Sequence, residues 1–303
     1  MEARRRRRST EPGAGRGELW ARAAPSLDVS VVVPYYNPGG RLVANVERML
    51  QVLGRAAVSF EVIAVSDGST DGSAEALAVL EALAGGNLRR VTLDRNWGKG
   101  QALRVGLAQG RGRYLGFIDA DGDLSPELLG PFVSLMRLYE PDIILGSKRH
   151  PMSEVHYPPA RRAYSWGYQQ LIRALFHLRV RDTQTGIKLV RREVLAAALP
   201  LMVEKRFAFD LELFVVASHL GHERFFEAPV RIEERFSSTI SLPAVARIFL
   251  DTLAIWYRLR LLRFYGPPRP GAGSGAGAAA GQGAAAGQGA AAGQEAGPPA
   301  GTR

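Results

Sequence analysis

The feature that most constrains the fold of this 303-residue chain is a short apolar run that ends in a polar turn and then recurs. Residues 28–33 lead into Pro-Tyr-Tyr-Asn, and residues 60–65 lead into Ser-Asp-Gly-Ser. A further strand is predicted at 88–93 and a helix at 98–110. Between the first two runs, apolar residues recur at the helical spacing of Leu42, Val46, Met49, Leu50 and Leu53. This order predicts an α/β protein with a parallel sheet, which binds ligands beyond the carboxyl ends of its strands.

A cluster of carboxylates follows the next predicted strand. The apolar run 114–118 ends in Asp119, Asp121 and Asp123, where a buried strand would reach solvent. Carboxylate oxygens suit Mg²⁺ or Mn²⁺, and Mg²⁺ usually takes one or two protein carboxylates together with substrate phosphates. The cluster therefore predicts a divalent ion and a nucleotide substrate. The alternative is a turn that caps a helix beginning near Ser125, because turns and caps favour the same residues.

The other polar turns also have a purely structural alternative. Residues 67–72, Asp-Gly-Ser-Thr-Asp-Gly, can form a tight loop, and Lys99 can be one solvated lysine among many. Each motif is weak alone. Their order along the chain, each at the end of a predicted strand, favours one shared binding site.

Together these segments resemble the nucleotide-diphosphosugar-binding half of the inverting family 2 glycosyltransferases, which have the GT-A fold. The resemblance covers residues 28–265 and implies a Rossmann-like, mostly parallel sheet flanked by helices, with amphipathic interface helices. One departure is Pro38, where the family usually has Glu. The residues that the resemblance places around the nucleotide are Pro34, Tyr36, Asn37, Ser66, Asp67, Gly68, Ser69, Lys99, Gly100 and Asp119.

The same resemblance assigns roles to the carboxylates. Asp121 and Asp123 would hold the metal ion, which stabilises the charge that develops on the leaving diphosphate. Asp119 would contact the ribose or the sugar. In-line attack from the face opposite the diphosphate would convert an α-linked donor into a β-linked product.

The second half of the chain narrows the resemblance to the dolichyl-phosphate and polyprenyl-phosphate sugar synthases. The motifs are Asp-Thr-Gln at 182–184, Gly-x-Lys-Leu at 186–189 and Phe-Asp-x-Glu-Leu at 209–213. They look closest to the dolichyl-phosphate β-glucosyltransferases, with the mannosyltransferases next. The resemblance implies UDP-glucose ahead of GDP-mannose as donor, and dolichyl or polyprenyl phosphate as acceptor.

A phosphate acceptor changes which residues matter. A phosphate monoester is largely a dianion at neutral pH and needs no general base, but its repulsion from the anionic donor must be reduced. The basic residues that match those of relatives at this task are Arg161, Arg162 and Arg235, while Lys148 matches a basic residue that relatives place facing the phosphates. A saccharide hydroxyl is the alternative acceptor, and it would need Asp210 or Glu212 as its base.

Two segments bear on membrane association. Residues 161–181 combine five arginines and no acidic residue with a helical repeat of apolar residues. This predicts a basic amphipathic helix on an anionic membrane surface, and the alternative is a helix packed in the core with a solvated arginine face. The apolar stretch 242–264 contains Asp251 and several arginines, so it is not expected to span a bilayer. We expect a peripheral protein on the cytoplasmic face, where a membrane-anchoring partner protein would be a further means of recruitment.

Composition sets the limits of the folded part. Residues 26–265 can form one globular domain, whereas the Arg-rich segment 1–25 and the Gly/Ala/Gln/Pro-rich segment 266–303 predict disorder. The formal net charge of +10 would suit nucleic acid as well as lipid head groups, but the carboxylate cluster would repel phosphate without a metal. We therefore expect no nucleic-acid partner. The chain has no cysteine, which excludes disulfides and thiolate sites.

Overall fold

The structure is a computed structural model that describes residues 25–154, 159–232 and 242–266, which belong to one compact unit. The predictions for both flanking segments therefore lie almost entirely outside the described residues. The elements in chain order are β1 Leu27–Tyr35, α2 Arg41–Arg55, β2 Phe60–Ser66, α3 Ser73–Leu83, β3 Leu88–Thr92, α4 Lys99–Leu107, β4 Gly112–Ile118, the 3₁₀ helix η1 Pro126–Leu128, α5 Leu129–Tyr139, β5 Ile143–Ser147, α6 Pro159–Phe176, β6 Ile187–Arg191, α7 Arg192–Ala198, α8 Phe209–His219, β7 Phe225–Pro229 and α9 Leu242–Arg260.

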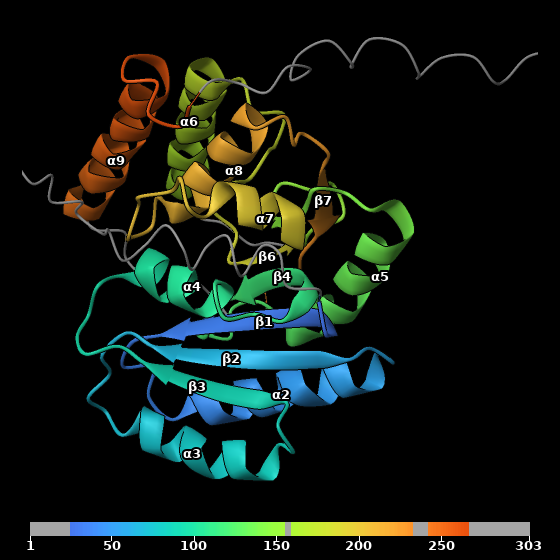
Figure 1. Ribbon diagram of the computed structural model, residues 1–303. Coiled ribbons are helices and arrows are strands. Elements are labelled where there is room, and N and C mark those ends of the chain that lie inside the picture. The colour runs from blue at the N-terminus through green and yellow to red at the C-terminus, as the bar shows by residue number, and fades with distance from the viewer. Residues whose placement is uncertain (1–24, 155–158, 233–241, 267–303) are drawn as a thin grey trace, which may run out of the picture. The chain divides into compact units, whose positions relative to one another are not determined.

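The strands form one seven-stranded sheet in the order β3-β2-β1-β4-β6-β5-β7 (Figure 1). β1 is parallel to β2 and β4, β2 is parallel to β3, and β5 is parallel to β7. β6 is antiparallel to both of its neighbours. The predicted mostly parallel sheet is confirmed. Because β2 and β4 lie on either side of β1, the carboxyl end of β1 is a point where ligands of such sheets bind.

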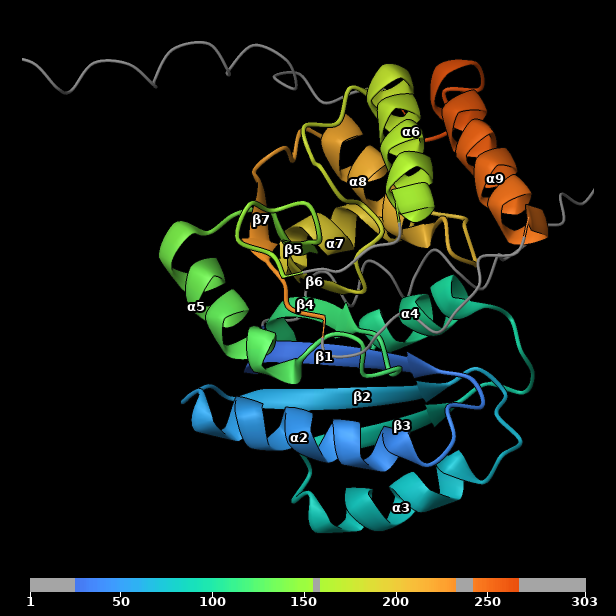
Figure 2. The same ribbon diagram turned by 180° about the vertical axis from the view of Figure 1, so that it is seen from behind.

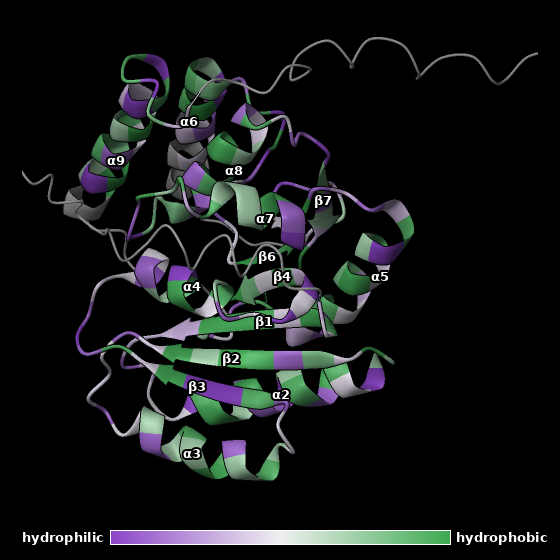
Figure 3. Cartoon of the chain, in the orientation of Figure 1, coloured by the Kyte–Doolittle hydropathy of each residue, from purple (hydrophilic) through white to green (hydrophobic). Residues whose placement is uncertain are grey.

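Helices cover both faces of the sheet, because alternate side chains of each strand point to opposite faces and both faces are buried. Val31 of β1 belongs to a core cluster with residues of α2, α3 and α5. Its neighbour Val32 belongs to a second cluster with residues of α4, α6, α7, α8 and α9. Figures 1 and 2 show these two layers from opposite sides, and Figure 3 shows the apolar colour of β1 and β2 between them.

α6 differs from the prediction in its length and in what its apolar face contacts. It ends at Phe176 and not near Arg181, because His177 adopts a left-handed conformation, with φ of 57°, that turns the chain. Ile172 and Phe176 are buried in the core cluster, while Arg173 is exposed. The prediction that this apolar face lies in lipid is wrong for these side chains. The alternative, a packed helix with a solvated basic face, is confirmed for the part whose side chains are described.

α9 packs beside α6, as Figures 1 and 2 both show. The hydroxyl oxygens of Tyr168 and Thr252 lie 2.9 Å apart across this contact. In the ranges that the structure describes, we find no helix with enough apolar length to cross a bilayer.

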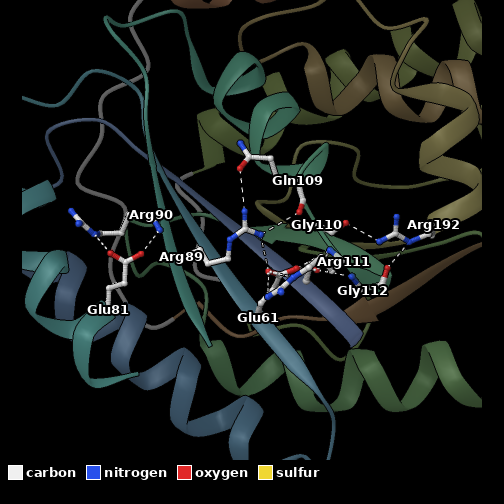
Figure 4. A network of polar contacts seen from close by, with 10 residues as sticks. Glu61, Glu81, Arg89, Arg90, Gln109, Gly110, Arg111, Gly112 and Arg192 are labelled. Carbon is white, nitrogen blue, oxygen red and sulfur yellow. Dashed lines mark hydrogen bonds and ion pairs between the residues drawn. The ribbon is translucent and has the colours of Figure 1, made fainter. Parts of the chain in front are cut away.

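A buried carboxylate organises the amino-terminal end of the sheet. Glu61 of β2 is fully buried. It accepts hydrogen bonds from the Ser30 hydroxyl and the Arg111 backbone N–H, both at 2.7 Å, and from the Arg89 guanidinium at 3.0 Å (Figure 4). Burial alone would raise the pKa of Glu61, but the hydrogen bonds from Ser30, Arg111 and Arg89 outweigh it and lower the pKa. The buried carboxylate at this end of the sheet therefore finds all its hydrogen-bond donors within the protein.

We expect Glu61→Gln to lower the free energy of unfolding by about 2 kcal/mol, because an amide cannot accept all the hydrogen bonds that the buried carboxylate accepts from Ser30, Arg89 and Arg111. Glu81→Gln is the matched control, since Glu81 pairs with Arg90 where both side chains are about a third exposed (Figure 4). It should cost less than about 1 kcal/mol. Urea unfolding followed by circular dichroism measures both values, and equal losses would contradict the role assigned to Glu61.

Candidate active site

A pocket of about 820 Å³ opens at the carboxyl ends of β1, β2 and β4. Its size lies within the range of about 300–1,000 Å³ that is usual for small-molecule sites. The residues that line it are Pro34, Tyr35, Tyr36, Pro38, Arg41, Asp67, Asn96, Gly98, Lys99, Ala102, Asp119, Ala120, Asp121, Asp123, Gln184, Arg206, Phe207 and Asp210.

Hydrogen bonds hold three loops together at one end of the pocket. The Asp67 carboxylate, just after β2, accepts the backbone N–H groups of Trp97 and Gly98, both at 2.8 Å. The backbone N–H of Asn37, after β1, donates to the Ser69 hydroxyl at 3.1 Å. The turns that follow β1, β2 and β3 are therefore fixed relative to one another.

Gly68 shows how closely two of these turns approach. Its φ is +72°, and a Cβ at this position would lie 2.5 Å from the backbone of Arg95, so a glycine is required there.

The predicted nucleotide-binding residues that line the pocket are Pro34, Tyr36, Asp67, Lys99 and Asp119. Those that are not among the lining residues are Asn37, Ser66, Gly68, Ser69 and Gly100.

Three carboxylates reach the pocket from the turn after β4. Asp119, Asp121 and Asp123 all line it, and Asp121 accepts the backbone N–H of Asp123 at 3.1 Å. Burial, and then the negative charges of Asp119 and Asp123, raise the pKa of Asp121. Asp119 lies against Gly186, where a Cβ would come within 2.1 Å of the Asp119 carboxylate. The glycine before β6 therefore makes room for this carboxylate.

Two lysines share the carboxylates at the inner side of the pocket. Nζ of Lys99 lies 2.6 Å from Asp119 Oδ1 and 3.8 Å from Asp210 Oδ2. Nζ of the fully buried Lys188 lies 2.6 Å from the other oxygen of Asp210. Burial would lower the pKa of Lys99, but the charges of Asp119 and Asp210 outweigh it and raise the pKa. For Lys188 burial dominates, and its pKa is lowered despite Asp210.

The carboxylates of this group are not all paired. Lys99 pairs with Asp119 and Lys188 pairs with Asp210, whereas Asp121 and Asp123 have no ion pair among the described residues. A divalent cation would balance the charges of these two carboxylates.

The donor set also fits such a cation. In the part of the chain with described structure, no three His, Cys, Asp or Glu side chains converge as a complete metal site. Asp121 and Asp123 offer two carboxylates in one pocket, and Mg²⁺ commonly takes only one or two from the protein and the rest from waters and substrate phosphates. The residues therefore fit Mg²⁺ or Mn²⁺ bound together with a phosphorylated substrate.

Lys148, predicted to face the phosphates, is not among the described residues that line this pocket. Lys148 follows β5, and its backbone N–H donates to Asp182 at 3.1 Å. The side chains of Arg161, Arg162 and Arg235 lie outside the described part of the structure.

The pocket also contains side chains that the sequence analysis did not name as site residues, namely Arg41, Gln184, Arg206 and Phe207. Nε2 of Gln184 is buried and has no hydrogen-bond partner among the described residues. Arg206 and Phe207 come just before the Phe-Asp-x-Glu-Leu motif, so their position next to this motif could have indicated that they belong to the site. Arg41 is the first residue of α2 and follows a Gly-Gly pair, and its neighbours do not indicate a binding site.

Comparisons with known proteins agree with this geometry. The family described as Glycosyl transferase family 2 matches residues 30–198. Dolichyl-phosphate beta-glucosyltransferases of Trichomonas vaginalis, Drosophila melanogaster and Homo sapiens are 30%, 35% and 32% identical to the chain. These alignments cover 76%, 65% and 68% of this chain, and 72%, 64% and 66% of those proteins.

Solved structures share the fold at lower identity. Glucosyl-3-phosphoglycerate synthase from Mycobacterium tuberculosis, in complex with Mn²⁺, UDP and phosphoglyceric acid, matches 85% of this chain with a TM-score of 0.58 and 20% identity, over 85% of its own length. Mannosyl-3-phosphoglycerate synthase from Rubrobacter xylanophilus matches 84% of this chain with a TM-score of 0.56 and 17% identity, over 80% of its length. The predicted GT-A fold is confirmed. On the family match and the identity to these relatives, the chain is a glycosyltransferase that belongs to glycosyl transferase family 2.

Proposed function

We propose that this protein transfers glucose from UDP-glucose to dolichyl or polyprenyl phosphate, with inversion at the anomeric carbon. The observation that carries the proposal is the identity of 30–35% to relatives named dolichyl-phosphate beta-glucosyltransferases, over 65–76% of this chain. GDP-mannose is the second candidate donor. The nucleotide would bind among the loops that Asp67 and Asn37 hold together.

The carboxylates that could act as a base for a hydroxyl acceptor are already engaged. Asp210 is 3% exposed and pairs with Lys188 at 2.6 Å. Glu212 is fully buried, and its Oε2 accepts the backbone N–H groups of Val203 and Glu204 at 2.9 and 2.7 Å. A hydroxyl acceptor needs a base that takes its proton, whereas a phosphate dianion does not. These contacts support a phosphate acceptor over the saccharide hydroxyl.

The carboxylates after β4 would serve the donor. Asp121 and Asp123 would hold Mg²⁺ or Mn²⁺, and the ion, when bound, would stabilise the negative charge that develops on the leaving diphosphate. Mn²⁺ and UDP occur together in a solved structure of the same fold. Asp119, held by Lys99 at 2.6 Å, would contact the ribose or the sugar.

Basic residues would reduce the repulsion between the two anionic substrates. Arg161, Arg162 and Arg235 remain our proposals for this task, and Lys148 remains our proposal for a basic residue that faces the phosphates.

The outer face of α9 supports association with an anionic membrane surface. Ile255 and Thr252 are fully buried on the inner side of this helix. The outer side exposes large apolar side chains, at 36–63% each, namely Val245, Phe249, Leu250, Leu253 and Tyr257, and Leu261, just after the helix, is 61% exposed. Exposed arginines at 247, 260 and 263 accompany them. Such a face suits the boundary between acyl chains and anionic head groups, which are abundant in the cytoplasmic leaflet. We therefore propose that the protein is peripheral on the cytoplasmic face of the membrane, where a membrane-anchoring partner protein would be a further means of recruitment.

The proposed activity predicts that label from radiolabelled UDP-glucose enters the organic phase when purified protein is incubated with Mn²⁺ and polyprenyl phosphate. The matched control is the corresponding polyprenol, which lacks the phosphate and should accept no sugar. Labelled GDP-mannose in a parallel reaction tests the second donor. Transfer to the polyprenol or to a free saccharide, with none to the lipid phosphate, would refute the proposed acceptor.

A metal requirement predicts that EDTA abolishes this transfer and that excess Mn²⁺ restores it. Asp121→Asn should raise the Mn²⁺ concentration needed for half-maximal turnover at least tenfold, since even residues that only support metal ligands contribute about 10–100-fold. Glu154→Gln is the control, because Glu154 is exposed and does not line the pocket. Full turnover in EDTA would exclude the metal.

Membrane association through α9 predicts that the double variant Leu250→Glu, Leu253→Glu binds vesicles of phosphatidylcholine and phosphatidylserine at least about tenfold more weakly than the unaltered protein. Leu138→Glu is the matched control, because Leu138 lies on α5 and is 71% exposed. Co-sedimentation with vesicles measures the binding. Equal binding by all three proteins would show that α9 does not contact lipid.

A further inference from the structure

Residues 203–207, here called the rim loop, connect α7 to α8 and are packed tightly against the start of α4. The backbone N–H of Gln101 donates to the carbonyl oxygen of Lys205 at 3.0 Å. A Cβ on Gly98 would lie 2.6 Å from that oxygen, and one on Gly100 would lie 2.8 Å from the carbonyl oxygen of Arg206. The glycines on either side of Lys99 thus allow the rim loop to contact the helix that carries this lysine.

The rim loop is also held from its other side. The buried carboxylate of Glu212 accepts the backbone N–H groups of Val203 and Glu204. The Glu204 side chain pairs with Arg258 of α9. With both sides fixed, the side chains of Arg206 and Phe207 are presented to the pocket from a rigid support.

Arg206 is a cation that the described protein does not neutralise. Its side chain lines the pocket and is exposed. Among the residues with described placement its guanidinium makes no hydrogen bond and no ion pair, although Lys99, in the same pocket, is paired with Asp119. An exposed guanidinium in a binding pocket suits an oxyanion, and above all a phosphate, which it can bind through two parallel hydrogen bonds.

Phe207 places an apolar ring next to this cation. It lines the same pocket and is 59% exposed. The ring gains free energy only if a ligand or another surface covers its apolar area. A cation and an open aromatic ring on consecutive residues therefore match a ligand in which a phosphate is joined directly to a hydrocarbon.

From this pairing we infer that Arg206 and Phe207 form the acceptor subsite, in which Arg206 binds the phosphate of an isoprenyl phosphate and Phe207 packs on its first isoprene units. The inference rests on the proposed function and adds to it the residues that the lipid phosphate would contact. The donor diphosphate is the other phosphate that could reach Arg206. A sugar nucleotide has no hydrocarbon chain for Phe207, so dependence on chain length separates the two sources.

The test uses the purified 303-residue chain and isoprenyl phosphates of one and of four or more isoprene units. Arg206→Gln should raise KM for both acceptors at least about tenfold and leave KM for UDP-glucose within about twofold. Phe207→Ser should raise KM roughly tenfold for the longer acceptor and much less for the single unit, and Phe207→Leu should restore most of the loss. Lys205→Gln is the matched control, because Lys205 lies in the same loop, is exposed and does not line the pocket.

Two results would overturn the subsite. One is a rise in KM for UDP-glucose, with KM for the acceptor unchanged, which would assign Arg206 and Phe207 to the donor. The other is an equal effect of Phe207→Ser on both chain lengths. In either case the unaltered protein still glucosylates the lipid phosphate, so the proposed function stands.

Equilibrium binding of a radiolabelled isoprenyl phosphate, measured without turnover, separates failure of the function from failure of the subsite. If the unaltered protein binds this lipid but transfers no glucose to it, the function fails, and the subsite stands only if Arg206→Gln weakens binding about tenfold. If the unaltered protein does not bind the lipid, both fail. Thermal unfolding of each variant confirms that the exposed substitutions leave the fold intact.

Discussion

The arrangement of the pocket depends on the buried pair of Lys188 and Asp210. β6 runs antiparallel between β4 and β5, and its register sets Lys188 opposite Phe117 and Leu145 in the interior of the sheet. A fully buried ammonium group is very unfavourable without an anion, and Asp210 of α8 supplies one. The second oxygen of this carboxylate faces Lys99 at 3.8 Å. One carboxylate therefore connects β6, α8 and the start of α4, and these elements enclose the inner side of the pocket.

The two ends of the sheet satisfy their buried charges differently. At the amino end, Glu61 is surrounded by donors from Ser30, Arg89 and Arg111, so it needs no ligand (Figure 4). At the carboxyl end, Lys99 and Lys188 cannot neutralise all the carboxylates that meet there, and burial together with neighbouring charge raises the pKa of Asp121. An unbalanced group in a pocket favours a cation from outside, which explains why the carboxyl end is the candidate active site.

Elements whose burial pattern is local could be predicted from the sequence. The helical repeat at Leu42, Val46, Met49 and Leu53 became the buried face of α2. The end of α6 could not be predicted, because Leu178 and Val180 continue the apolar pattern after the helix stops and are buried in a segment that is not helical. The apolar pattern does not distinguish these two backbone conformations. The antiparallel direction of β6 could not be predicted either, because the sequence of its five residues, Ile187–Arg191, does not indicate which strands pair with it.

The candidate site divides in the same way. Asp119 and Asp121 directly follow a predicted strand, so their place at the edge of the sheet could be predicted. Arg206 and Phe207 reach the pocket only because the rim loop packs on Gly98 and Gly100, a contact between distant parts of the chain. Asp210 and Glu212 stand two residues apart in the first turn of α8, where a helix rotates by about 200°, so their side chains leave it in opposite directions. Asp210 neutralises the lysines of the pocket, while Glu212 holds the rim loop and accepts the Tyr265 hydroxyl at 2.7 Å. Both carboxylates therefore support the fold around the pocket, and loss of activity in an amide variant of either one would not by itself identify a catalytic base.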